Sequence, residues 1–173
     1  MQLFEAIDRR RSIRAYRAAP IEPAKIDAIV AAARLAPSAG DLQAYLILIV
    51  EKSETKVRLA EAALGQTFIT EAPIVLIFLA DTRRSGRKYA ERGATLFSIQ
   101  DATIAAAYAQ LAAQAQGLGS CWVGAFDEAR VAEVLGAPTH LRPIALMPVG
   151  YPAEAPARPA RRTVSELVRH EKF

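Results

Sequence analysis

The N-terminal region carries four arginines around one serine in the run RRRSIRAY. Guanidinium groups bind phosphate through paired, charge-assisted hydrogen bonds, and a hydroxyl group among them can contact a sugar or sugar alcohol. The cluster therefore predicts a site for a doubly charged anion. A solvated, charged helix end is the alternative that this segment alone leaves open. The residues concerned are Arg9, Arg10, Arg11, Ser12 and Arg14.

A second segment, GLGSCWVGAF, runs from a helix end into a strand and then into a loop at Gly124. A backbone without a Cβ can lie against a planar ring, and its N–H can donate to an atom at the ring edge. A tight turn is the alternative reading. The dinucleotide fingerprint G-x-G-x-x-G is not satisfied, because Trp122 occupies the position of the third glycine and a helix precedes the segment.

The basic residues are concentrated rather than spread along the chain. Net charge is +4, and 15 of the 22 Lys and Arg residues lie in the windows 9–17, 83–92 and 158–172. Small-ligand sites would concentrate charge in this way. A nucleic-acid-binding protein would more often show a basic stripe with interleaved aromatics or a known recognition module, so we expect no nucleic-acid partner.

The remaining reactive side chains predict neither a metal site nor a protein nucleophile. Cys121 is the only cysteine and lies in an apolar strand, which favours a buried core thiol. His140 and His170 lack the spacing of metal ligands, and no G-x-S-x-G motif surrounds Ser38. Because neither a metal site nor a protein nucleophile is predicted, the sequence favours a reaction carried out by a bound organic cofactor.

The composition is that of a globular protein, with 52% hydrophobic and 23% charged residues in a chain of 173. We expect a single domain over residues 1–173. No apolar run reaches the ~20 residues that span a bilayer, and no signal-type segment is present, so we expect a cytoplasmic protein without a membrane partner.

Periodicity and capping signals predict an α+β domain around a mixed or antiparallel sheet of about four or five strands. The expected strands are 46–50, 74–80, 121–123 and 144–149. The expected helices are one ending at the arginines, then 23–34, 53–64 (capped by Ser53), 95–116, 127–135 (capped by Asp127) and a last one in an extended tail, capped by Thr163 and Glu166. The polar stretch 81–93 is expected to be a mobile loop.

The expected helix over 95–116 is long, rich in alanine and apolar nearly all round. Such a helix must be buried on most sides, either within one subunit or against a partner. Dimerisation is an economical explanation in a domain of this size.

The chain resembles the nitroreductase family of small FMN-dependent oxidoreductases along nearly its whole length. Four segments carry the resemblance, in the family's order and at plausible spacing: RRRSIRAY, PSAGDLQAY, GLGSCWVGAF, and PVGYP followed by RPARR. The resemblance implies the nitroreductase fold. It also implies a homodimer with FMN at the interface and a C-terminal arm exchanged between subunits.

The resemblance also implies cofactor-binding residues. The FMN phosphate and ribityl chain would be held by Arg10, Arg11, Ser12 and Arg14, with Arg161 or Arg162 from the tail. The ring system would be lined by Pro37, Ser38, Ala39 and Gly40 of the other subunit, by Gln43, and by Trp122, Val123 and Gly124, with the Gly124 amide facing N5.

The implied reaction is carried by the cofactor rather than by the protein. NADH or NADPH would deliver hydride to flavin N5, and a nitroaromatic, quinone or related acceptor would then take the electrons. Relatives with this fold also catalyse dehalogenation, dehydrogenation or flavin fragmentation, and a non-catalytic flavin-binding protein is a further alternative.

The chain departs from the family pattern at four positions. Asp41 stands where Asn is usual, Ala44 replaces Pro, Tyr45 replaces Trp, and Tyr108 stands where Asn is common. An ionised Asp41 near the ring would lower the flavin potential by repelling the anionic reduced form. Tyr108 either fills core volume or stacks in the substrate pocket.

The basic stretch after the second strand is a further candidate for binding a reactant. It would hold the 2′-phosphate of NADPH or an acidic acceptor, and a solvated loop is the alternative. The residues are Arg83, Arg84, Arg87 and Lys88.

Overall fold

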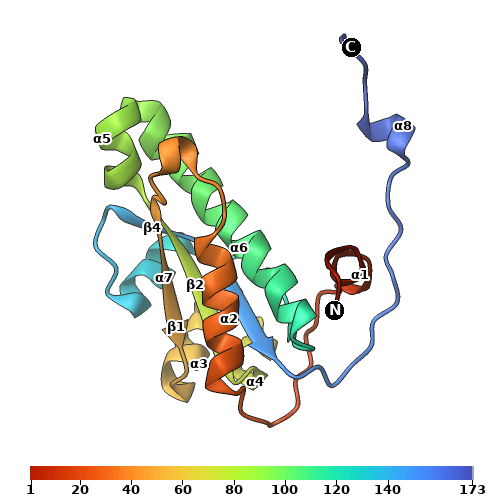
Figure 1. Ribbon diagram of the computed structural model, residues 1–173. Coiled ribbons are helices and arrows are strands. Elements are labelled where there is room, and N and C mark those ends of the chain that lie inside the picture. The colour runs from red at the N-terminus through yellow and green to blue at the C-terminus, as the bar shows by residue number, and fades with distance from the viewer. Residues whose placement is uncertain (173) are drawn as a thin grey trace.

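A four-stranded sheet forms the centre of the computed structural model, which describes residues 1–172 (Figure 1). The strands are β1 (Tyr45–Val50), β2 (Ile74–Asp81), β3 (Gly119–Ser120) and β4 (Leu141–Gly150). Their order is β1-β2-β4-β3, and every neighbouring pair is antiparallel. The fold is therefore α+β, as expected. Of the two kinds of sheet that the sequence left open, mixed and antiparallel, the structure has the antiparallel one.

Helices cover both faces of this sheet. They are α1 (Leu3–Arg9), α2 (Pro23–Arg34), α3 (Ser53–Ala62), α4 (Phe68–Glu71), α5 (Thr82–Arg92), α6 (Ser98–Ala115), α7 (Glu128–Leu135) and α8 (Val164–Leu167), with short turns η1 (Ala39–Asp41) and η2 (Gly93–Phe97). Helices α2 and α6 pack on one face, and α3, α4 and α7 contribute to the cluster on the other.

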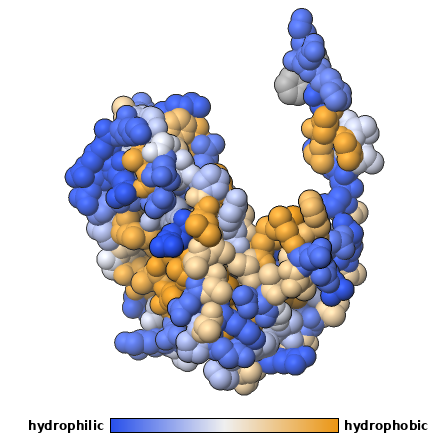
Figure 2. Space-filling view, viewed as in Figure 1, coloured by the Kyte–Doolittle hydropathy of each residue, from blue (hydrophilic) through white to orange (hydrophobic). Residues whose placement is uncertain are grey.

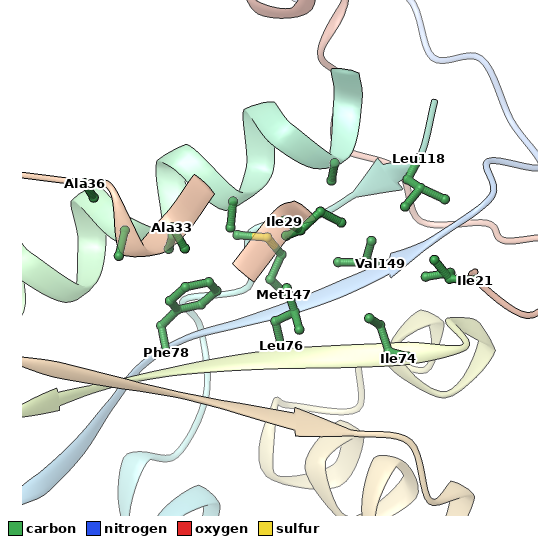
Figure 3. Packing of buried hydrophobic residues seen from close by; sticks show 14 residues of the cluster. Ile21, Ile29, Ala33, Ala36, Ile74, Leu76, Phe78, Leu118, Met147 and Val149 are labelled. Carbon is green, nitrogen blue, oxygen red and sulfur yellow. The ribbon is translucent and has the colours of Figure 1, made fainter. Parts of the chain in front are cut away.

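The central strand β2 is buried along nearly its whole length because both of its faces are covered. Successive side chains point to opposite faces of a strand. Leu76 and Phe78 accordingly pack beneath α2 and α6, together with Met147 of β4 (Figure 3). The alanines of α6 keep that helix close to Ile29 and Ala33 of α2. The expected long helix is confirmed over Ser98–Ala115, after the turn η2. Within this chain α6 is buried along one face only, and Tyr108 outside that face is 42% exposed.

The basic stretch 81–93 is a helix, α5, and the expectation of a mobile loop is wrong. Asp81 caps the helix, because its Oδ1 accepts from the Arg84 N–H at 2.8 Å. Of the two glycines that suggested a loop, Gly93 is required by packing. A Cβ on Gly93 would lie 2.4 Å from the Ser85 carbonyl oxygen, so only glycine allows this close approach.

Three smaller expectations are also corrected. Strand β1 is an edge strand rather than a buried one, with Leu46 50% and Leu48 41% exposed. Strand β3 lies just before the expected 121–123, where Val123 forms only an isolated bridge to Leu146. Helix α3 begins at Ser53, which therefore does not cap it.

The chain after β4 leaves the body of the protein as an extended arm, residues 152–172 (Figure 1). Helix α8 forms near its end, where the Glu166 carboxylate accepts from the Thr163 N–H at 2.7 Å, as the capping box predicts. Asp127 likewise caps α7 as expected. None of the helices within residues 1–172 is long and apolar enough to cross a membrane.

Candidate functional site

The arginines near the N-terminus and one arginine of the C-terminal arm line a common cavity of about 390 Å³. We call it the arginine cavity. Its lining residues are Arg10, Arg11, Ser12, Arg14, Pro156, Ala157, Pro159 and Arg161. None of them is acidic. Two stretches nearly the whole chain apart in sequence thus present guanidinium groups to one space.

The arm is held beside the N-terminal segment by backbone pairing. Arg17 N–H donates to the Tyr151 carbonyl oxygen, and Ala153 N–H donates to the Ala15 carbonyl oxygen, each at 2.9 Å. Glu154 adds a charged anchor, since its Oε1 accepts from the backbone N–H groups of Arg14 and Ala15. These contacts bring the following residues of the arm to the arginine cavity.

Arg10 is surrounded by positive charge in the arginine cavity, and no acidic residue lines the cavity to balance it. Burial lowers the pKa of the Arg10 guanidinium, and the positive charges of Arg161 and Arg11 lower it further. A bound dianion would remove this repulsion and give the guanidiniums charge-assisted acceptors. The cavity therefore fits the phosphate group of a nucleotide such as FMN.

Only one of the two arm arginines expected to bind the phosphate lines the arginine cavity. Arg161 lines the cavity, whereas the Arg162 Nη2 donates to the Glu166 carbonyl oxygen at 2.6 Å. Arg162 is thus engaged with α8 and is not part of the cavity lining.

Strand β3 supports the arginine cavity from behind. Ser12 forms a parallel bridge with Ser120, and the Ile13 N–H donates to the Ser120 carbonyl oxygen at 3.0 Å. Cys121 is buried as expected. Burial raises the pKa of the Cys121 thiol against the opposing effect of Arg14, so the thiol stays protonated and inert.

The segment GLGSCWVGAF continues beyond β3 to Gly124, whose backbone N–H is free to donate a hydrogen bond. Val123 is paired to Leu146 through hydrogen bonds of 2.9 and 3.0 Å, and Trp122 is half-buried. Gly124 follows in the exposed loop, where a Cβ would lie 3.0 Å from the Trp122 Nε1. The Gly124 N–H has no acceptor within residues 1–172. It can therefore donate to an atom of a ligand.

The PSAGDLQ loop (Pro37–Gln43) has an unusual backbone that is fixed by local hydrogen bonds. Gly40, Asp41 and Gln43 have φ angles of 57°, 56° and 48°, in the left-handed region. Ser38 Oγ accepts from the Gln43 N–H at 2.9 Å. Conformations of this kind persist only where surrounding contacts enforce them.

Asp101 of α6 is the main support of this loop, and the sequence analysis missed it. It is 2% exposed, and its carboxylate accepts from the Ala39 N–H at 2.9 Å and the Ala44 N–H at 3.2 Å. A single acidic residue inside an alanine-rich helix that is otherwise uncharged was the available signal. Such a residue needs a buried partner.

A mostly apolar cavity of about 530 Å³ lies between the PSAGDLQ loop and α6. It is lined by Pro37, Ser38, Ala39, Phe97, Ile99, Gln100, Asp101, Thr103 and Ile104. A flat ring could pack here. No residue lines both this cavity and the arginine cavity. The segments that line the two cavities lie toward opposite ends of α6 (Figure 1).

Of the other residues expected to bind substrate, only some lie near the PSAGDLQ loop. Arg84 and Lys88 of α5 lie against the PSAGDLQ loop, whereas Arg83 contacts His140 instead. Arg87 is exposed on the same helix. Tyr108 is 42% exposed, so it does not fill core volume, and it lines a cavity beside α1 rather than the loop.

Comparison with known proteins tests the expected family. The nitroreductase family model matches residues 7–73 and 63–151. An "NADH dehydrogenase" of Thermus thermophilus is 38% identical over 84% of this chain and 84% of its own length. An "FMN reductase (NADPH)" of Bacillus subtilis is 30% identical over 97% of this chain and 72% of its own length.

Solved structures show the same fold. The NADPH:FMN oxidoreductase from Vibrio harveyi complexed with NAD+ superposes with a TM-score of 0.91 at 29% identity, over 99% of this chain and 77% of that one. A putative NADH dehydrogenase/NAD(P)H nitroreductase from Parabacteroides distasonis has a TM-score of 0.87 at 26% identity, over 100% of this chain and 99% of that one. This chain belongs to the nitroreductase family.

Proposed function

We infer that this chain is an FMN-dependent NAD(P)H oxidoreductase, acting as one domain over its length. One observation carries the inference: arginines from both ends of the chain converge on a cavity without an acidic lining residue. Relatives described as "FMN reductase (NADPH)" and "NADPH-flavin oxidoreductase" support the same cofactor and electron donor.

The arginine cavity is proposed to hold the FMN phosphate. Arg10, Arg11, Arg14 and Arg161 supply the positive charge, and Ser12 supplies a hydroxyl group for the ribityl chain. Hydrogen bonds to charged groups contribute about 1.5–3 kcal/mol each, so several together would retain FMN without a covalent link.

The PSAGDLQ loop is proposed to line the ring system of the FMN that is held by the other subunit of a homodimer. The support is that no residue lines both cavities and that the segments lining them lie toward opposite ends of α6 (Figure 1). Two chains side by side would bring one cavity of each together. Gln43 and the open Gly124 N–H would then contact the ring edge, with Trp122 and Val123 behind it.

Exposed apolar surface supports such a dimer. In α1, Phe4 is 82% and Leu3 62% exposed, and edge strand β1 is half uncovered. The C-terminal arm exposes Val164 and Leu167. Figure 2 shows a hydrophobic region on this arm, away from the body of the protein. An arm that crosses to the partner would bury these side chains, so we propose that it is exchanged between subunits.

The chemistry that FMN supplies when bound is hydride transfer at N5, from NADH or NADPH and then to a nitroaromatic, quinone or related acceptor. This chain's residues bind and orient the reactants, and we assign no protein acid or base to the reaction. Because the reaction draws on reduced nicotinamide coenzyme, we propose the cytoplasm as its setting.

The test is the purified, full-length protein. Its absorbance spectrum should show flavin bands, the released cofactor should have the mass of FMN, and anaerobic addition of NADH or NADPH should bleach the bands. A colourless protein that takes up no FMN in calorimetry would overturn the proposal. Bound FMN that neither coenzyme reduces would instead identify a non-catalytic flavin-binding protein.

A further inference from the structure

Helix α5 carries a concentration of positive charge that has no negative partner. Between Thr82 and Arg92 it contains Arg83, Arg84, Arg87, Lys88 and Arg92, and one acidic residue, Glu91. No ion pair within residues 1–172 includes a cation of this helix. In Figure 2 the helix forms a strongly hydrophilic region at the upper left.

Three of these cations share one helical face. Residues three and four positions apart are neighbours on a helix, so Arg84, Arg87 and Lys88 lie side by side. We call them the basic face of α5. Like charges at this spacing destabilise a helix. A bound anion would replace this repulsion with attraction, so the arrangement costs stability in the free protein and favours an anionic ligand.

The basic face borders the loop that is proposed to line the flavin. The Lys88 Nζ lies 2.6 Å from the position that a Cβ on Gly40 would occupy, and the Arg84 Nε donates to the Leu42 carbonyl oxygen. Asp41 of the same loop forms no ion pair with either cation and instead accepts from the Gln43 amide at 3.1 Å. An anion on this face would therefore sit beside the space where reactants meet the ring.

We propose that the basic face of α5 binds the phosphate monoester of a reactant, with the 2′-phosphate of NADPH as its main source. The cofactor's own phosphate has a separate site, the arginine cavity, toward the other end of α6. The inference rests on the proposed function, because it assigns a second phosphate to the same reaction. The phosphate of free FMN, used as an acceptor, is the other source with this chemistry.

The test compares coenzymes in the FMN-loaded enzyme with an uncharged quinone as acceptor. For Lys88→Gln, and separately for Arg87→Gln, the ratio of kcat/KM for NADPH to that for NADH should fall about tenfold, mainly through KM. This corresponds to about 1.4 kcal/mol. Arg58→Gln in α3 removes the same charge from an exposed site on another helix and should leave the ratio unchanged.

A binding measurement gives a readout other than activity. In calorimetry, 2′,5′-ADP should bind the loaded wild-type enzyme more tightly than AMP does, and Lys88→Gln should abolish the difference. If the coenzyme ratio holds but the variant loses its preference for FMN over riboflavin as acceptor, the phosphate recognised is that of the acceptor. If neither preference changes in either variant, the inference is overturned, whereas failure of the unchanged enzyme to bind FMN would overturn the proposed function itself.

Discussion

Arg10 is the residue at which burial and like charge act together against the charged form, and its loss should weaken cofactor binding without weakening the fold. All of its charged neighbours in the arginine cavity are cations. We expect Arg10→Gln to raise the Kd for FMN about 10- to 100-fold, as loss of one charged hydrogen bond implies. Fluorescence titration of the apoprotein measures this value.

Arg162→Gln is the matched control, because Arg162 contacts the Glu166 carbonyl oxygen and does not line the cavity. It should leave the Kd for FMN within about twofold of the wild-type value. Equal losses in the two variants would mean that only net charge matters, and would contradict a specific role for Arg10.

Asp41 should tune the potential of the bound flavin. It is exposed at the turn of the PSAGDLQ loop, with its carboxylate held by the Gln43 amide at 3.1 Å. A negative charge near the ring disfavours the anionic reduced flavin, so Asp41→Asn should raise the midpoint potential by about 10–30 mV. Spectroelectrochemical titration tests this. Glu51→Gln, which removes an exposed charge elsewhere, serves as control, and an unchanged potential in Asp41→Asn would refute the prediction.

The residue scale is where the sequence was most informative about the site. The order of the motifs predicts binding roles for the arginines, the PSAGDLQ loop and Gly124. Asp101 and Glu154 were missed, because each acts by accepting backbone N–H groups from segments far away in sequence. A carboxylate of this kind has no motif of its own, and only the folded chain shows what it supports.

Among the elements, α5 shows why local composition can mislead. Its glycines and polar residues are typical of a loop, and the chain nevertheless forms a helix because Asp81 caps it and Gly93 permits close packing on Ser85. The core elements were easier to predict. The continuous apolar run of β2 indicates a strand buried on both faces, and the alanine-rich stretch of α6, which lacks glycine and proline, indicates a long helix.

The junction between α5 and α6 stores backbone strain at Ala90. Its φ of 50° and ψ of −139° form a combination that glycine adopts far more readily than alanine. We expect Ala90→Gly to increase the free energy of unfolding by about 1 kcal/mol and Tm by about 2–4 °C. Thermal unfolding followed by circular dichroism measures both.

Ala31→Gly in α2 provides the opposite control, because an exposed helical alanine has no strain to lose. It should lower the free energy of unfolding by about 1 kcal/mol. Destabilisation of similar size in both variants would show that Ala90 is not strained.

At the scale of the whole molecule, the proposed FMN site would draw residues from two chains. Sequence reasoning suggested a partner from the apolar length of α6, but it could not say which surfaces meet. In the structure the largest uncovered side chain of α1 is Phe4, and Ile7 and Tyr108 line an apolar cavity of about 500 Å³ nearby. Exposed apolar surface of this extent marks an interaction site.

Phe4→Asp should therefore dissociate the proposed dimer and remove FMN together with it. Because Phe4 is 82% exposed in the single chain, the substitution leaves the fold of that chain intact. Light scattering after size exclusion should show the mass falling from about twice 18.7 kDa to 18.7 kDa, and the eluted protein should be colourless. Val57→Asp, at an exposed apolar position of α3, should keep both the dimer and the flavin. A Phe4→Asp monomer that still holds FMN would show that each chain completes its own site, and the two-subunit arrangement would be wrong.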